Sequence, residues 1–312
     1  MIKFRMIKTA FCAPVAFILL LTSSAYSAGE VLKDVVYKKV AQKELHLDIL
    51  YPEQPVEGGY PIVVHTHGGG WAAGNKASLH RGLKNDVAEG LLANGFCIVS
   101  VQYRLYRKGG TVAIRDCVTD AKDAIRFMAK HREKYQVNTD RVYTFGDSAG
   151  GQLCQMLLLS GADQHLGAEE LREERYQMVA GVSWYGPSDF EDMQLFNHDG
   201  REDFRDRFGP RIMRPTDPAA DKLKLYRDMS PVNYLSAESA PLLMIQGDGD
   251  TTIPVAHAYH MKERAEAVKA PVKTLIVKHA GHNWRKADGK TEISPSKEVI
   301  ARETIQFLTK HQ

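Results

Sequence analysis

Two glycine-rich motifs, each directly after an apolar run, constrain the fold of this chain most strongly. The first reads HGGGW at residues 67–71, and the second, about eighty residues later, reads GDSAGG at residues 146–151. Glycine-rich turns are common on their own. Two of them in this order predict a loop of convergent backbone N–H groups and a sharp strand-to-helix turn that raises a serine.

The rest of the chain alternates between apolar, strand-like runs and helical segments. Two alternating runs near the amino end predict an antiparallel pair at the edge of a sheet. This pair is predicted at 31–40 and 44–51, the other strands at 61–66, 96–103, 141–145, 179–185, 242–246 and 272–278, and the helices at 78–94, 112–135, 149–159, 254–268 and 296–310. The pattern predicts the α/β class, with a mostly parallel eight-stranded sheet and helices on both faces. Both motifs fall at carboxyl ends of strands, where such sheets bind their ligands.

The domain organisation is simple. With 312 residues, 44% of them hydrophobic, the chain is long enough for one large domain. We find no repeat or linker that divides residues 28–312, and we predict a single domain there. Residues 190–231 interrupt the alternation, because they are dense in charge, contain Pro210, Pro215 and Pro218, and lack a strand pattern. We predict a short lid-like insertion over the carboxyl edge of the sheet; a solvated excursion without a role in substrate binding is the alternative.

The first residues have the features of an export signal. Three basic residues precede an apolar run at 10–21, and a small-x-small cleavage site ends at Ser27. We therefore predict a signal peptide over residues 1–27 and a periplasmic or secreted location. A retained membrane anchor is the alternative, although a spanning helix needs about 20 apolar residues. The three basic residues account for the whole formal net charge of +3. After cleavage we therefore expect neither a nucleic-acid partner nor a membrane contact.

Cysteines give little further information. Cys97, Cys117 and Cys154 remain after cleavage, and this odd number leaves at least one thiol unpaired. We expect buried thiols at Cys97 and Cys154, which lie in a strand pattern and a helix pattern. A disulfide at Cys117 is the alternative for that residue.

The serine of the second motif is the predicted nucleophile. Ser148 lies between an apolar strand and a helical run, so that the turn holds it at a helix N-terminus. A serine hydroxyl also needs a base and donors that stabilise an oxyanion. The N–H of Ala149 is one predicted donor, and the N–H groups of Gly69 and Gly70 are the others. We expect His67 to brace this loop.

The acid and the base are expected after two later strands. Asp250 lies where the loop after 242–246 turns into a helix, and it is the predicted acid. Asp248 and Asp189 are its rivals. His282 follows a glycine in the loop after the last strand and is the predicted base, in preference to His279 at the strand end. The order serine, aspartate, histidine is the one expected for a hydrolase of the α/β class.

These motifs resemble those of α/β-hydrolase esterases, more narrowly the hormone-sensitive-lipase-like carboxylesterases and the bacterial acetyl and feruloyl (BD-FAE-like) esterases. The resemblance covers residues 35–307 and is carried by HGGGW, YRL at 103–105, GDSAGG, WYGP at 184–187 and Gly281-His282. It implies the α/β-hydrolase fold, a triad of Ser148, Asp250 and His282, and an oxyanion hole at Gly69, Gly70 and Ala149. The chain lacks a helical cap before the first strand and reads YRLYR where that lipase group reads YRLAP. Both departures favour the less-capped esterases that act on carbohydrate.

The expected substrate is a small ester or an acylated saccharide. Trp71 and Trp284 flank the predicted chemistry and are candidate walls of the substrate pocket. Export favours acetyl or feruloyl groups on polysaccharide. An arylformamidase-like amide hydrolase and an inactive binding protein on the same fold are the alternatives. We expect no metal and no cofactor, and we interpret His257 and His260 as solvated helix histidines because no third ligand lies near them.

Overall fold

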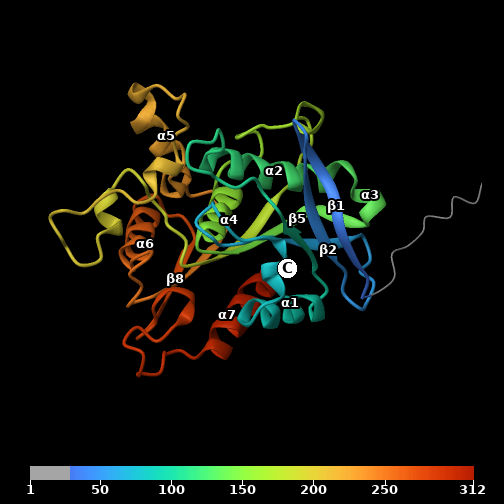
Figure 1. The fold of residues 1–312 in the computed structure, drawn as a ribbon. Coiled ribbons are helices and arrows are strands. Elements are labelled where there is room, and N and C mark those ends of the chain that lie inside the picture. Colours follow the sequence, from blue (N-terminus) through green and yellow to red (C-terminus); the bar gives the residue numbers. More distant parts are fainter. Residues whose placement is uncertain (1–28) are drawn as a thin grey trace, which may run out of the picture.

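Eight strands form one mixed sheet at the centre of the molecule. The computed structural model describes residues 29–312, so the predicted signal peptide, residues 1–27, lies outside the described residues. The strands are β1 (Val31–Val40), β2 (Lys43–Leu50), β3 (Tyr60–Thr66), β4 (Cys97–Val101), β5 (Val137–Asp147), β6 (Met178–Trp184), β7 (Leu242–Gly247) and β8 (Val272–Val277). Their order in the sheet is β1-β2-β4-β3-β5-β6-β7-β8. Figure 1 shows β1 and β2 toward one side of the molecule and β8 toward the other. β1 and β4 pair with β2 in antiparallel fashion, and all other neighbours are parallel. The predicted sheet, including its antiparallel edge, is confirmed.

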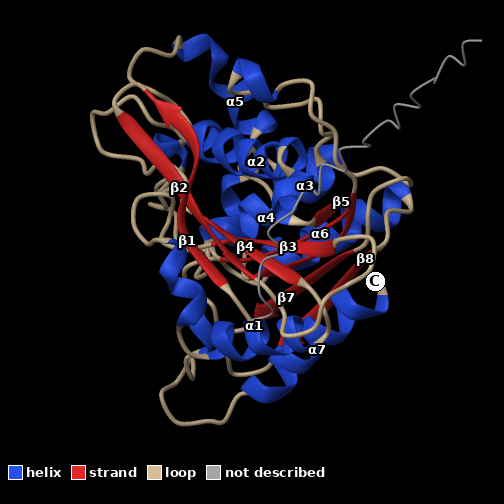
Figure 2. Ribbon diagram, turned by 90° about the vertical axis from the view of Figure 1, so that its right-hand side faces the viewer, coloured by secondary structure: helices blue, strands red, loops and turns tan. Residues whose placement is uncertain are grey.

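Helices cover both faces of this sheet. They are α1 (Leu83–Ala93), α2 (Ile114–Lys130), α3 (Arg132–Tyr135), α4 (Ala149–Leu159), α5 (Lys222–Asp228), α6 (Ala256–Val268) and α7 (Lys297–Lys310). Figure 2 shows α1 and α7 on one face and α2, α4 and α6 on the other. The predicted helix over 112–135 is interrupted at His131, which separates α2 from the short α3.

Two hydrophobic layers follow from the alternation of side chains along each strand. In β3, Val63 packs toward α1 and α7, whereas Ile62 and Val64 pack toward α2 and α4. Every residue of β3 and β4 is buried, because both faces of these central strands are covered. The HGGGW motif thus follows directly on a strand, β3, that is buried along its whole length.

The insertion at 190–231 packs against the loops at the carboxyl end of the sheet. It contains α5 and several short 3-10 turns, and α5 was not predicted from the sequence. Phe190 and Phe208 contact the ring of Trp71, with centroids 5.8 Å apart in each case. Arg211 Nη1 donates a hydrogen bond to the carbonyl oxygen of Gly70 at 2.5 Å. The segment therefore lies directly on the HGGGW loop, and its action as a lid stays a prediction.

The described cysteines are all free and buried, as expected for Cys97 and Cys154; Cys117 forms no disulfide either. Burial raises the pKa of the Cys154 thiol to about 12. No helix within residues 29–312 has the length and apolar character required to cross a membrane.

Candidate active site

The turn between β5 and α4 holds Ser148 in a strained conformation. Its φ of 55° and ψ of −119° lie in a region that side chains with a Cβ rarely adopt. This conformation is stabilised because the Ser148 N–H donates a hydrogen bond of 2.8 Å to the carbonyl oxygen of Trp184, at the end of β6. The turn is tight enough that a Cβ added at Gly150 would lie 1.9 Å from the carbonyl oxygen of Thr66. Glycine is therefore required at this position.

The structure brings Ser148, His282 and Asp250 into one hydrogen-bonded chain. The Ser148 Oγ lies 3.0 Å from His282 Nε2, and His282 Nδ1 lies 2.7 Å from Asp250 Oδ2. Asp250 is buried, and its Oδ1 accepts the N–H groups of Thr252 and Ile253 at 2.8 and 3.0 Å. The carboxylate is thus fixed by its loop, with one oxygen left to orient the imidazole.

The rival acids and base lie outside this chain. Asp248 has Lys278 Nζ as its ionic neighbour at 3.9 Å. Asp189 Oδ2 lies 3.0 Å from His260 Nε2. His279 is exposed on the strand end. None of these groups is placed to exchange a proton with Ser148.

The interpretation of the α6 histidines as solvated is wrong. His257 is fully buried, and its ring packs against Phe196 of the insertion at 4.2 Å between centroids. Its Nδ1 accepts the N–H of Ser188 at 3.2 Å. His260 is largely covered and bonded to Asp189. Their burial depends on a segment far away in the sequence, which the helical pattern does not reveal.

Three backbone N–H groups are free beside Ser148. Among the described residues, the N–H groups of Gly69, Gly70 and Ala149 donate to no protein acceptor. Positive φ angles of 118° and 59° at the two glycines turn the loop at this point. These are the donors that the sequence predicted for an oxyanion, and the structure places them on the HGGGW loop and at the start of α4, on either side of the serine.

His67 supports this loop, as the sequence suggested. Its ring stacks on Tyr103 with centroids 4.2 Å apart, and its Nδ1 donates to the carbonyl oxygen of Gly68 at 2.8 Å. Burial lowers the pKa of His67 to about 4, so the imidazole is neutral near pH 7. The Tyr103 hydroxyl donates to the carbonyl oxygen of His67 at 2.6 Å.

A cavity of about 320 Å³ opens on the triad. It is lined by Gly69, Gly70, Trp71, Asp147, Ser148, Phe208, Thr252, Ile253, His282 and Asn283. Trp71 is fixed there by a hydrogen bond from its Nε1 to Gln152 Oε1 at 3.1 Å. Phe208 forms part of the wall of the cavity. It was not predicted, because no motif in the charged segment around it indicates a pocket residue. The cavity is small, and its lining combines apolar rings with polar groups.

Trp284 does not line this cavity, so its assignment to the substrate pocket does not fit the structure. Its ring packs on Tyr185 and Trp184, with centroids 4.7 and 5.6 Å apart. Tyr185 in turn packs against the ring of His282 at 4.7 Å. Trp284 therefore packs against His282 indirectly, through the ring of Tyr185.

Comparison with known proteins gives relatives over most of the chain. It is 29% identical to a probable carboxylic ester hydrolase, LipM, of Mycobacterium tuberculosis over 73% of this chain and 50% of the relative. It is 28% identical to esterase LipC of the same organism over 77% of this chain and 57% of the relative. The chain thus spans about half the length of these curated relatives.

Solved structures show the same fold. A truncated carbohydrate esterase from gut microbiota superposes with a TM-score of 0.72 at 19% identity, covering 91% of this chain and 97% of the other. A thermophilic esterase of Thermogutta terrifontis with bound propionate superposes with a TM-score of 0.68 at 22% identity, covering 91% and 94%. The model of the BD-FAE family matches residues 47–265, a range that contains Ser148 and Asp250 and ends before His282. This match spans most of the chain, and with the α/β-hydrolase architecture it shows that the chain belongs to the BD-FAE family.

Proposed function

We propose that this chain is an exported serine carboxylesterase that removes short acyl groups, acetyl or feruloyl, from carbohydrate. The observation that carries the proposal is the chain of Ser148 Oγ, His282 and Asp250, which opens on a small cavity beside three free N–H groups. The names of the relatives support ester hydrolysis. A cavity of about 320 Å³ walled by Trp71 and Phe208 favours a short acyl group.

The proposed reaction has two halves. Ser148 Oγ attacks the ester carbonyl carbon while His282 Nε2 takes the hydroxyl proton, and the carbonyl oxygen becomes an oxyanion facing the N–H groups of Gly69, Gly70 and Ala149. His282 returns the proton to the leaving alcohol oxygen as the bond to it breaks, which leaves an acyl-enzyme. His282 then takes a proton from water as the water oxygen attacks the acyl carbon. It returns this proton to Ser148 Oγ as the bond from Oγ to the acyl carbon breaks, which releases the carboxylic acid and free Ser148. Asp250 holds Nδ1–H and stabilises the imidazolium in both halves.

A labelling experiment tests the chemistry. A fluorophosphonate probe is expected to label the protein and not the Ser148→Ala variant, because only an activated serine reacts with it. Labelling that is independent of Ser148, or absent, would instead favour an inactive binding protein on this fold.

An acyl series tests the substrate. We expect kcat/KM for p-nitrophenyl acetate and butyrate to exceed that for decanoate, and acetylated xylan or methyl ferulate to be cleaved. A preference for decanoate would contradict the small acyl pocket, and hydrolysis of an N-formyl arylamine in place of these esters would favour the amide hydrolase.

A further inference from the structure

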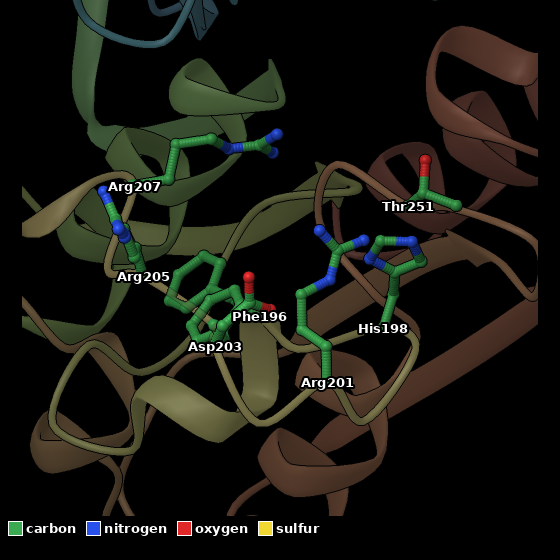
Figure 3. A pocket seen from close by; sticks show the side chains of 8 residues that line it. Phe196, His198, Arg201, Asp203, Arg205, Arg207 and Thr251 are labelled. Atoms are coloured by element: carbon green, nitrogen blue, oxygen red, sulfur yellow. The ribbon is translucent and has the colours of Figure 1, made fainter.

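A second cavity lies in the insertion, next to the one that holds the triad. It has a volume of about 490 Å³, and its lining carries the basic side chains of His198, Arg201, Arg205 and Arg207 against a single acid, Asp203. Figure 3 shows Arg205 and Arg207 on one side of it and Arg201 and His198 on the other.

The two cavities share a wall. Phe208 lines the catalytic cavity, and its ring is contacted by the guanidinium groups of Arg207 and Arg211, at 4.7 and 5.3 Å from the ring centroid. Arg207 Nη2 also donates to the carbonyl oxygen of Thr252 at 2.9 Å. Thr252 lines the catalytic cavity, whereas the preceding Thr251 lines the basic one. The side chain of Phe208 thus lies between this cavity and a substrate bound at Ser148.

Two of the three arginines in this cavity, Arg205 and Arg207, are not neutralised by a carboxylate of the loop. Within residues 29–312, neither Arg205 nor Arg207 forms an ion pair with a carboxylate. Asp199 is paired with Arg201 instead. Asp206 accepts the N–H groups of Phe208 and Gly209 and the hydroxyl of Tyr226. Asp199 and Asp206 are therefore occupied by other partners, and Asp203 is the one acid in the lining of the cavity.

Arg205 and Arg207 are exposed at the edge of the cavity and have no carboxylate partner among the described residues, which suits them to a planar oxyanion. A guanidinium presents its N–H groups as a fork that matches the two oxygens of a carboxylate. We propose that this cavity binds the carboxylate of a uronic acid residue, so that the esterase selects acylated acidic saccharides over neutral ones. This proposal rests on the function proposed above and adds the class of saccharide to it.

The test compares two acetylated oligosaccharides of equal length, a neutral xylo-oligosaccharide and one that carries a glucuronic acid. For the unaltered protein, kcat/KM is expected to be about tenfold higher on the acidic one, the effect of one charged hydrogen bond. In the double variant Arg205→Gln with Arg207→Gln this ratio is expected to fall to near one, mainly through KM. Arg205→Gln alone removes a side chain without a hydrogen bond or ion pair in the described structure and is expected to reduce the ratio in part.

A control removes the same charge elsewhere. Arg172 and Arg175 are exposed on another part of the surface, and the double variant Arg172→Gln with Arg175→Gln is expected to keep the tenfold ratio. A fall of the ratio in this control would show steering by net charge and overturn a local site. Equal hydrolysis of both oligosaccharides by the unaltered protein would overturn the site and leave the esterase intact.

A failure of the proposed function is distinguishable from a failure of the site. If the protein hydrolyses no ester, calorimetric titration with the deacetylated acidic oligosaccharide decides the matter for the cavity alone. Binding that is lost in the Arg205→Gln, Arg207→Gln variant and kept in the control would support the site, and no binding would overturn it.

Discussion

Backbone strain at single residues is concentrated around the triad. Trp71, Ser148, Tyr185, Asn283 and Trp284 all have positive φ although none is glycine. Such conformations cost about 1–3 kcal/mol each and persist where surrounding contacts fix them. The contacts are present: Ser148 N–H is bonded to the end of β6, and the Trp71 indole is bonded to α4. The protein thus holds its reactive groups ready before substrate binds.

A substitution at Asp250 best tests the hydrogen-bonded chain of Ser148, His282 and Asp250. In Asp250→Asn the side chain offers His282 Nδ1 an amide in place of a carboxylate, which disfavours the tautomer that leaves Nε2 free to accept the serine proton. We expect kcat for p-nitrophenyl acetate to fall by about 10⁴-fold with little change in thermal unfolding. Asp248→Asn, two residues away in the same loop, is the matched control and is expected to retain activity. A loss of equal size in both variants would contradict the assignment.

At the scale of elements, α2 connects the edge strand and the insertion to the body of the protein. Asp120 and Asp123 of this helix both accept from Lys38 Nζ of β1, at 2.8 and 2.7 Å. Asp116 Oδ1 accepts from Arg214 Nη2 of the insertion at 2.5 Å. Side chains at such spacings share one helix face, which here serves as an anchor for distant parts of the chain.

Releasing the insertion from α2 should make it open more often. Two pairs hold it, Arg214 with Asp116 and Arg115 with Asp217, and the arginine side chains are 32% and 20% exposed. Partly exposed pairs contribute roughly 0.5–1 kcal/mol each, so Arg115→Gln with Arg214→Gln is expected to speed chymotrypsin cleavage within 190–231 by about tenfold. Arg227→Gln breaks an exposed pair of the same segment and serves as the control. Unchanged cleavage in the double variant would show that these two ion pairs do not hold the segment.

Local patterns predicted the elements well where each element carries its own signal. The strand before Ser148 was expected at 141–145, and β5 begins earlier, at Val137, because Tyr60 and Pro61 of β3 pair with Val137 and Asn138. The triad residues were identifiable because each follows a strand that ends at the same edge of the sheet. Phe208 and the burial of His257 were not, since both depend on how 190–231 packs. The contacts of that segment, such as its ion pairs with α2, join residues about one hundred positions apart in the chain.

At the scale of the whole molecule, the core contains histidines that it keeps neutral. His65, His67 and His257 are fully buried. Burial lowers the pKa of His67 to about 4 and that of His257 to about 3, and it lowers the pKa of His65 well below 6.5. All three histidines change the free energy of unfolding in the same direction as the pH falls. Each stays unprotonated in the folded protein at a pH at which the unfolded chain takes up a proton.

Stability is therefore expected to be fully present above about pH 7 and to fall as the pH decreases from 6.5 toward 4. In that window each buried histidine lowers the free energy of unfolding by up to about 1.4 kcal/mol per pH unit. Urea unfolding at pH 7.5, 6.0, 5.5 and 5.0 gives the slope. The slope of the unfolding free energy against pH measures how many protons are taken up on unfolding. In His257→Gln this number should decrease by about one, whatever the absolute stability of the variant. His80→Gln, at an exposed position, should leave the slope unchanged. An identical slope in His257→Gln and the unaltered protein would contradict a lowered pKa of the buried His257 imidazole.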